Sequence, residues 1–136
     1  MSKALFVTGT GTDVGKTYVT ALLVKKLQET GKTNAYYKAA MSGNEQGPDG
    51  ALLPGDALFV KNTAGLSQPA DTMCPYVYRQ AVSPHLAARL EGGPVDPAAV
   101  QAGFQAVCAS YDFVTVEGSG GILCPLRWDE QHHLWL

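Results

Sequence analysis

The N-terminal segment carries glycine, threonine and lysine residues at a spacing that suits phosphate binding. The sequence GTGTDVGKT at residues 9–17 follows a short apolar run, residues 4–7, and precedes a helix-like segment. In this order of strand, loop and helix, backbone N–H groups of the loop and of the helix start converge on a polyphosphate. Lys16 would reach the outer phosphates, and the Thr17 hydroxyl would ligate Mg²⁺. The sequence therefore predicts a site for ATP or GTP.

The glycine spacing of this loop departs from the common G-x-x-x-x-G-K-[S/T] pattern. That pattern places its first glycine where this chain has Thr10, and Gly9 lies one residue farther from Gly15 and Lys16. The alternative interpretation is a glycine-rich turn that precedes Lys-Thr by chance. Because strand, loop and helix follow in the right order, the phosphate loop is favoured, and the variant spacing narrows the choice of family.

Two further groups of polar residues follow predicted strands. Residues 33–40 read as a second strand, and Lys38 and Ser42 lie near its end. Residues 111–116 are β-branched and aromatic, which predicts a buried strand, and EGSGG at residues 117–121 follows it. Ligands of parallel α/β sheets bind outside the carboxyl ends of the strands. We therefore expect residues 9–17, 38–42 and 117–121 to meet at one edge and form a single site.

Helix signals alternate with these strands. An amphipathic period predicts a helix over residues 17–30, which Gly31 ends, and Asp56 stands near the cap of a short helix over residues 56–61. Proline signals predict two more helices, over residues 85–91 and from Asp96-Pro97 to about residue 110. Residues 41–55 read as a long surface loop. Alternating strands and helices predict an α/β layer fold with a mostly parallel sheet.

Composition restricts the class of protein. The 136 residues suit one domain, and a hydrophobic content of 46% with 16% charged residues is typical of a globular chain. The net charge of −2 indicates neither a nucleic-acid surface nor a membrane surface. The sequence contains neither a bilayer-length apolar stretch nor a signal-like start, and its three cysteines form no close metal-ligand pair. We therefore expect a reduced, cytoplasmic setting.

Each polar candidate also has an ordinary structural interpretation. Lys38 could be a strand-end lysine in water. Asp56 could serve only as a helix cap, and Glu117 could be a solvated loop carboxylate. Ser42 precedes a glycine, as turn residues often do. Only the whole set, in its order along the chain, favours the functional interpretation.

Four motifs in this order resemble dethiobiotin synthase: GTGTDVGKT (9–17), YKAAMSG (37–43), GDAL (55–58) and VEGSGG (116–121). The segment SPH at residues 83–85 is also similar, and the resemblance runs from about residue 3 to about residue 126. It implies an ATP- and Mg²⁺-dependent cyclo-ligase of biotin biosynthesis. In that reaction 7,8-diaminononanoate takes up CO₂ as a carbamate, ATP phosphorylates the carbamate, and the second amine closes the ring to give dethiobiotin, ADP and phosphate.

The resemblance also implies residue roles. Lys16 would hold the transferred phosphoryl group, and Lys38, expected to lie away from the phosphate loop, would neutralise the carbamate. Mg²⁺ would be held by Thr17, Asp56 and Glu117, and the substrate by Thr12, Lys38 and Ser42. The nucleotide would be bound by Asp13, Val14, Gly15, Lys16, Thr17, Tyr18, Asp56, Glu117, Gly118, Ser119 and Gly120.

The chain covers about three-fifths of the length usual for that family. We therefore expect a C-terminally truncated form of a P-loop NTPase-like, three-layer domain over residues 1–136, with outer strands of the sheet missing. No strand or helix is expected after Leu126, although residues 127–136 could begin a helix. The resemblance implies a homodimer. A nucleotide-binding fragment without turnover, or another P-loop ATPase, stays open as an alternative function.

Overall fold

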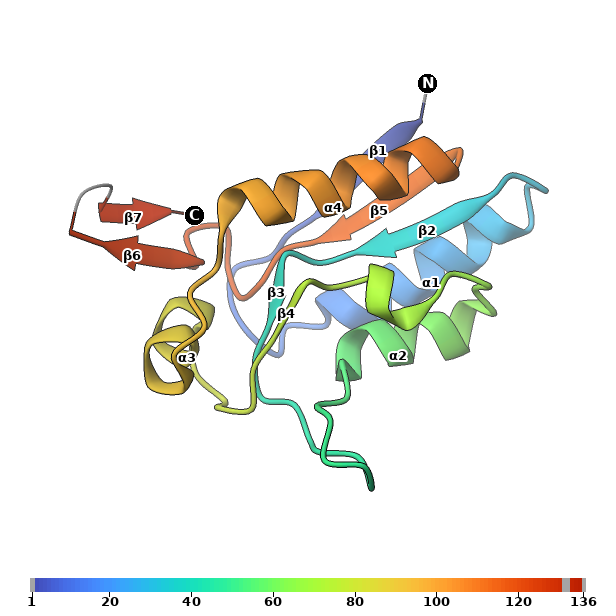
Figure 1. Ribbon diagram of the computed structural model, residues 1–136. Helices are drawn as coiled ribbons and strands as arrows, with labels where there is room; N and C mark the ends of the chain where they lie inside the picture. Colours follow the sequence, from blue (N-terminus) through green and yellow to red (C-terminus); the bar gives the residue numbers. More distant parts are fainter. Residues whose placement is uncertain (1, 131–132, 136) are drawn as a thin grey trace.

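A parallel sheet forms the centre of the molecule. The computed structural model describes residues 2–130 and 133–135, and Figure 1 shows their α/β arrangement. Three parallel strands lie in the order β1 (Lys3–Val7), β5 (Phe113–Glu117) and β2 (Asn34–Tyr37). In register, Val7 lies opposite Glu117, and Tyr37 lies opposite Val116. The carboxyl ends of all three strands therefore lie at the same edge.

Helices cover both faces of this sheet. The helices α1 (Lys16–Gln28) and α2 (Gly55–Ala64) pack on one face, and α4 (Pro97–Ser110) lies across the other (Figure 1). The short helix α3 (Pro84–Glu91) lies beyond the end of the sheet, and a 3₁₀ turn, η1, spans Ala70–Thr72. This arrangement confirms the predicted α/β fold with a parallel sheet.

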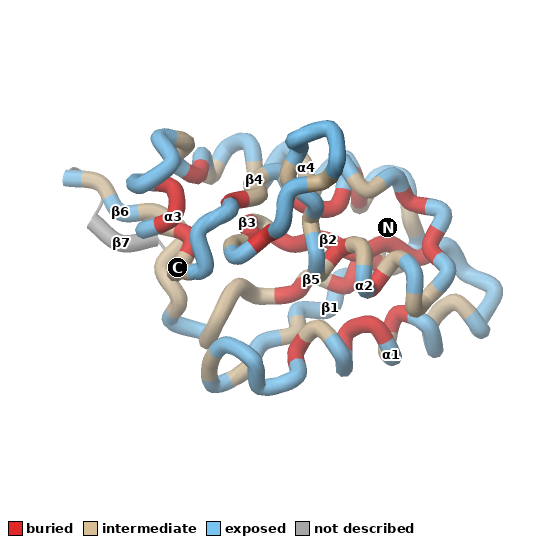
Figure 2. Tube along the Cα trace, turned by 90° about the horizontal axis from the view of Figure 1, so that it is seen from below, coloured by how far each residue is buried: buried red, intermediate tan, exposed pale blue. Residues whose placement is uncertain are grey.

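The side chains of β2 alternate between the two faces, as a buried strand requires. Tyr36 packs among the apolar residues of α1 and α2, including Val24 and Val60. Ala35 and Tyr37 face the other way, into a cluster with residues of α4 and β5. Figure 2 shows buried residues along β2 and on one side of α1. Both faces of β2 are thus filled, which fixes its register beside β5.

The predicted helix starts lie within one residue of the observed ones, whereas α1 ends two residues before its predicted end and α2 ends three residues after it. The Asp96 side chain caps α4 by accepting a hydrogen bond from the N–H of Ala98 at 3.0 Å, and Pro97 fills the first helical position. Gly92 ends α3 with φ of 78°, in the left-handed region. In the described part of the chain, no helix is both long enough and apolar enough to cross a membrane.

The strand predicted over residues 33–40 is divided into two. It leaves the central sheet after Tyr37, where the Lys38 N–H donates to the carbonyl of Met73 at 2.9 Å. The chain then forms β3 (Ala40–Met41), which pairs in parallel with β4 (Tyr76–Val77) in a separate sheet. The prediction of one continuous strand was wrong because an apolar run does not show where its hydrogen-bonding neighbour changes.

The chain after Leu126 contains strands, which corrects the expectation of no regular element or of a helix start. An antiparallel pair joins β6 (Arg127–Asp129) to β7 (His133–Trp135). The Arg127 guanidinium donates to the Val95 carbonyl at 3.1 Å and to the Asp129 carboxylate at 2.9 Å, which holds β6 extended against the fold. Residues 131, 132 and 136 of this segment lie outside the described residues.

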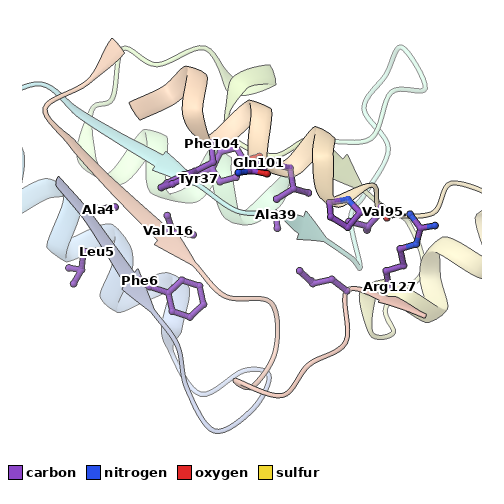
Figure 3. A pocket seen from close by; sticks show the side chains of 13 residues that line it. Ala4, Leu5, Phe6, Tyr37, Ala39, Val95, Gln101, Phe104, Val116 and Arg127 are labelled. Carbon is purple, nitrogen blue, oxygen red and sulfur yellow. Dashed lines mark hydrogen bonds between the residues drawn. The ribbon is translucent and has the colours of Figure 1, made fainter. Parts of the chain in front are cut away.

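The strand β1 has one free edge within the described part of the chain, since only β5 pairs with it there. Leu5 and Phe6 of this strand are 47% and 57% exposed. An apolar pocket of about 460 Å³ lies beside it, between the sheet and α4. Figure 3 shows Phe6 and Val116 on the sheet side of this pocket and Phe104 on the helix side.

Candidate functional site

The strand ends form one pocket, as their predicted order along the chain indicated. Its volume is about 490 Å³, and its lining mixes polar and apolar surface, whereas the pocket beside β1 is almost entirely apolar. Residues from the phosphate loop, from the ends of β2 and β5 and from the start of α2 line it: Thr12, Asp13, Gly15, Lys16, Thr17, Tyr18, Lys38, Asp56, Phe59, Glu117 and Gly120. Most of the predicted site residues therefore surround a single cavity.

Glu117 is the centre of a hydrogen-bond network in this pocket. It is the last residue of β5 and is only 2% exposed. Its Oε1 atom accepts hydrogen bonds from Thr17 Oγ1 at 2.7 Å and from Lys38 Nζ at 2.9 Å. Its Oε2 atom accepts from the Tyr36 hydroxyl at 3.0 Å. The interpretation of Glu117 as a solvated loop carboxylate is therefore wrong, and burial of a carboxylate requires such partners.

Lys38 joins two carboxylates. Its Nζ atom lies 2.7 Å from Asp56 Oδ2 and 2.9 Å from Glu117 Oε1, and the residue is 5% exposed. Burial acts to lower the pKa of Lys38, but Glu117 and Asp56 outweigh it and hold the pKa above its ordinary value. Lys38 is thus not a lysine in water. The expectation that Lys38 lies away from the phosphate loop was also wrong, because Lys38 and Thr17 both donate to Glu117.

Asp56 lies in the first turn of α2 and does not cap that helix. The cap position is Pro54, and no side chain accepts a hydrogen bond there. The carboxylate instead turns toward Lys38, with 39% of its side chain exposed to the pocket. The interpretation of Asp56 as only a helix cap is therefore not supported by its contacts.

The phosphate loop has the backbone shape that anion binding needs. Gly15 stands at the start of α1 with φ of 99°, and Asp13 has φ of 57°. Left-handed residues at such positions typically turn successive backbone N–H groups toward one side, which is the geometry of an anion site. Lys16 is 9% exposed, and its Nζ atom donates to the carbonyl of Gly11 within the same loop.

Four residues of the predicted set do not line the pocket: Val14, Ser42, Gly118 and Ser119. The Ser119 hydroxyl donates to the Ala40 carbonyl at 2.5 Å, and the Gly118 N–H donates to the Val7 carbonyl at 2.9 Å. Both bonds hold the segment after β5 against its neighbours. Ser42 is half-buried just beyond β3, because the chain leaves the central sheet before reaching it.

Two residues at this site were missed from the sequence. Phe59 lines the pocket from α2 and follows Asp56 by three residues, so helical periodicity places both on the same face. Tyr36 precedes Lys38 by two residues in an extended segment, so both side chains point to the same side. The spacing of Phe59 from Asp56 and that of Tyr36 from Lys38 could each have indicated these residues from the sequence.

The oxygen donors in the pocket fit a hard divalent cation. Thr17, Asp56 and Glu117 offer hydroxyl and carboxylate oxygens, which Mg²⁺ prefers, and Asp56 and Glu117 already hold the Lys38 ammonium, another cation, between them. Among the described residues, no group of three or more His, Cys, Asp and Glu side chains could enclose a metal. Water and phosphate oxygens would therefore complete the ligand shell, as is usual for Mg²⁺.

Comparison with known proteins is consistent with this site. The sequence matches the family described as AAA domain over residues 3–131. It is 48% identical over 126 residues to an ATP-dependent dethiobiotin synthetase of Clostridium botulinum (strain ATCC 19397 / Type A), covering 93% of this chain and 55% of that protein. It is 43% identical over 136 residues to the synthetase of Brachyspira hyodysenteriae (strain ATCC 49526 / WA1), covering 100% of this chain and 59% of that protein. The resemblance stated from the motifs is thereby confirmed.

Proposed function

This chain belongs to the AAA domain family, and from that premise we propose that it acts as an ATP- and Mg²⁺-dependent cyclo-ligase of biotin biosynthesis. Its substrates would be 7,8-diaminononanoate, CO₂ and ATP, and its products dethiobiotin, ADP and phosphate. The chain spans 55% and 59% of the two synthetases described above, so the activity of those longer proteins is a proposal for this one.

The observation that carries this proposal is the sharing of Glu117 between Thr17 and Lys38. Thr17 belongs to the phosphate loop, whereas Lys38 lies at the end of another strand. A nucleotide held by the loop would therefore have its outer phosphate next to a buried ammonium. Phosphoryl transfer needs this combination of positioning and charge neutralisation more than it needs covalent help.

The residues on the phosphate side of the pocket would have distinct roles. Backbone N–H groups of residues 13–18 would bind the phosphate oxygens, and Lys16 would leave the Gly11 carbonyl to contact the transferred phosphoryl group. Thr17, Asp56 and Glu117 would hold Mg²⁺. When bound, the ion neutralises charge on the phosphate oxygens and aligns them.

The substrate side of the pocket centres on Lys38. One amine of the diamine attacks the carbon of CO₂ and loses a proton, which gives a carbamate. A carbamate oxygen then attacks the outer phosphorus of ATP, and ADP leaves. The second amine attacks the carbonyl carbon and loses a proton while phosphate departs. Lys38 would neutralise the carbamate and the mixed anhydride, a preorganised charge contact of the kind that lowers such barriers. Thr12, which lines the pocket, would donate a hydrogen bond to the same substrate.

Phosphate release measured with and without the diamine tests this function. The 136-residue chain is mixed with ATP, Mg²⁺ and bicarbonate, and products are followed by phosphate assay and mass spectrometry. Diamine-dependent phosphate release with formation of dethiobiotin supports the proposal. ATP binding without phosphate release would instead identify a nucleotide-binding chain without turnover. Phosphate release that ignores the diamine would indicate another P-loop ATPase.

We also propose that the protein works in the cytoplasm as a homodimer. All three cysteines, Cys74, Cys108 and Cys124, are free thiols, which suits a reducing compartment. The dimer rests on the resemblance to dethiobiotin synthase. Sedimentation velocity tests it, and a monomer across the micromolar range would contradict it.

A further inference from the structure

The hydroxyl of Tyr36 is the innermost polar partner of Glu117. Tyr36 is fully buried, with 0% exposure, and its ring packs in the core cluster between the sheet, α1 and α2. Its hydroxyl donates to Glu117 Oε2 at 3.0 Å. A hydrogen bond from a buried donor to a buried carboxylate is of the strong, charge-assisted kind.

The two oxygens of Glu117 have different surroundings. Oε2 meets the Tyr36 hydroxyl on the core side, whereas Oε1 meets Thr17 and Lys38 on the pocket side. A carboxylate bound at one oxygen loses the freedom to rotate about its last bond. The contact with Tyr36 therefore fixes the plane of the carboxylate, and with it the direction in which the other oxygen faces the pocket.

Tyr36 is itself held by Gln68. The Tyr36 N–H donates to Gln68 Oε1 at 2.8 Å, and Gln68 Nε2 donates to the Tyr36 carbonyl at 3.0 Å and to Thr72 Oγ1 at 3.1 Å. Gln68 is 0% exposed, and the Lys61 ammonium donates to its backbone carbonyl. The amide of Gln68 thus pairs with the outer edge of β2 as a neighbouring strand would, and it fixes Tyr36 along the strand axis.

We propose that Tyr36, held in place by Gln68, is a positioning residue that orients Glu117 for the metal ion. The proposal rests on the proposed function, because it takes Glu117 as a ligand of Mg²⁺. Tyr36 does not touch the pocket and binds neither nucleotide nor metal. It acts through Glu117, as outer partners of metal ligands generally do.

The neighbouring tyrosine provides a matched control. Tyr37 is also buried, and its hydroxyl also makes one hydrogen bond, donating to the Val100 carbonyl at 2.7 Å. That bond lies on the α4 side of the sheet, where Figure 3 shows Tyr37 beside Phe104. Tyr36→Phe and Tyr37→Phe therefore remove the same atom from adjacent residues, with only the first contacting Glu117.

The test is calorimetric titration of the full 136-residue chain with ATP, once with Mg²⁺ and once with a chelator. The gain in ATP affinity that Mg²⁺ provides should fall about tenfold in Tyr36→Phe, since losing an outer partner typically costs ten- to a hundredfold. Affinity for metal-free ATP should not change. Tyr37→Phe should keep the full Mg²⁺-dependent gain. Equal losses in the two variants, or an equal loss with and without metal, would overturn the proposal.

A second variant, Gln68→Met, keeps the Tyr36 hydroxyl but removes the side-chain amide that holds the Tyr36 backbone. Gln68→Met should also reduce the Mg²⁺-dependent gain, by less than Tyr36→Phe, and it decides the question if Tyr36→Phe does not fold. An unchanged gain in a folded Gln68→Met chain would contradict the role assigned to Gln68. If the wild-type chain binds ATP equally well with and without Mg²⁺, the proposed function itself fails, a result distinct from equal losses in the two variants.

Discussion

At the scale of single residues, the ammonium of Lys38 and a divalent cation compete for the same oxygens. Lys38 Nζ lies between Asp56 Oδ2 and Glu117 Oε1, within 2.9 Å of both. A metal ion bound to these oxygens would repel the ammonium, because two cations held by the same pair of carboxylates lie close together in a partly buried pocket. Metal binding would therefore turn Lys38 away from Asp56 and Glu117 and toward an anionic substrate in the same pocket.

The substitution Lys38→Met tests this competition. Without nucleotide, the variant should bind Mn²⁺ about tenfold more tightly, since a gain of about 1.4 kcal/mol is modest for removing a competing charge at this distance. Phosphate release should nevertheless fall about a hundredfold, because a preorganised charge is lost. Electron paramagnetic resonance measures free Mn²⁺ directly. Lys26→Met, on the exposed side of α1, serves as the control, and weaker metal binding by Lys38→Met would contradict the competition.

The order of strands and loops was sufficient to bring together Lys16, Thr17, Lys38 and Glu117. Parallel strands end at one edge of the sheet, so residues at their ends converge whatever the details of packing. The spacing of Tyr36 and Lys38 indicates that both side chains lie on one side of the strand, but the contact between the Tyr36 hydroxyl and Glu117 depends on how helices and sheet pack. Ser42 was predicted to lie at the pocket but does not, because an apolar run does not show that the chain changes sheets after Tyr37.

At the scale of elements, the start of α1 depends on the backbone of Gly15. Its φ of 99° lies in the left-handed region, where a side chain is strained even though a Cβ atom there would meet nothing within 4 Å. Gly11, in the same loop, also has open space around a Cβ position, and its φ lies outside that region. The two glycines therefore separate the cost of backbone strain from the cost of crowding.

Gly15→Ala should lower the free energy of unfolding by about 1–3 kcal/mol, the usual cost of such a backbone position. Gly11→Ala should change it by less than about 0.5 kcal/mol, as substitutions in open space usually do. Urea denaturation followed by circular dichroism measures both. Similar losses in the two variants would show that the loop does not require the left-handed turn.

Capping residues, prolines and glycines in the sequence predicted the helices whose ends are set by residues next to them in the chain. Asp96-Pro97 begins α4 and Gly92 ends α3, because a cap and a left-handed glycine act within one turn of helix. The pair of β6 and β7 was missed, since its strands are short and Arg127 is held by Val95, far away in the sequence. A contact between residues so far apart in the chain produces no periodic pattern in the sequence around either one.

At the scale of the whole molecule, every core cluster contains a side chain that can lose a proton at high pH. Cys74 and Tyr36 belong to the cluster under α1 and α2, Tyr78 to the cluster around α3, and Tyr37 to the cluster under α4. Burial raises the pKa of Cys74 from 9.0 to about 12, and that of Tyr37 and Tyr78 from 10.0 to about 12. Burial, followed by the charge of Glu117, also raises the pKa of Tyr36 well above its usual range.

These shifts predict that the fold loses stability as the pH rises above about 9. Between the unfolded and folded pKa values the unfolded chain binds fewer protons, so the free energy of unfolding falls with rising pH. Cys74 alone should contribute a slope of about 1.4 kcal/mol per pH unit above its unfolded pKa of 9.0, and the tyrosines should steepen the fall above 10.0. Urea denaturation at pH 8, 9, 10 and 11 measures the slope. Cys74→Ala should make the fall between pH 9 and 10 shallower, while Cys124, whose pKa burial also raises, still contributes there. A free energy of unfolding that stays constant from pH 8 to 11 would show that these groups lose their protons at the same pH in the folded and unfolded chain.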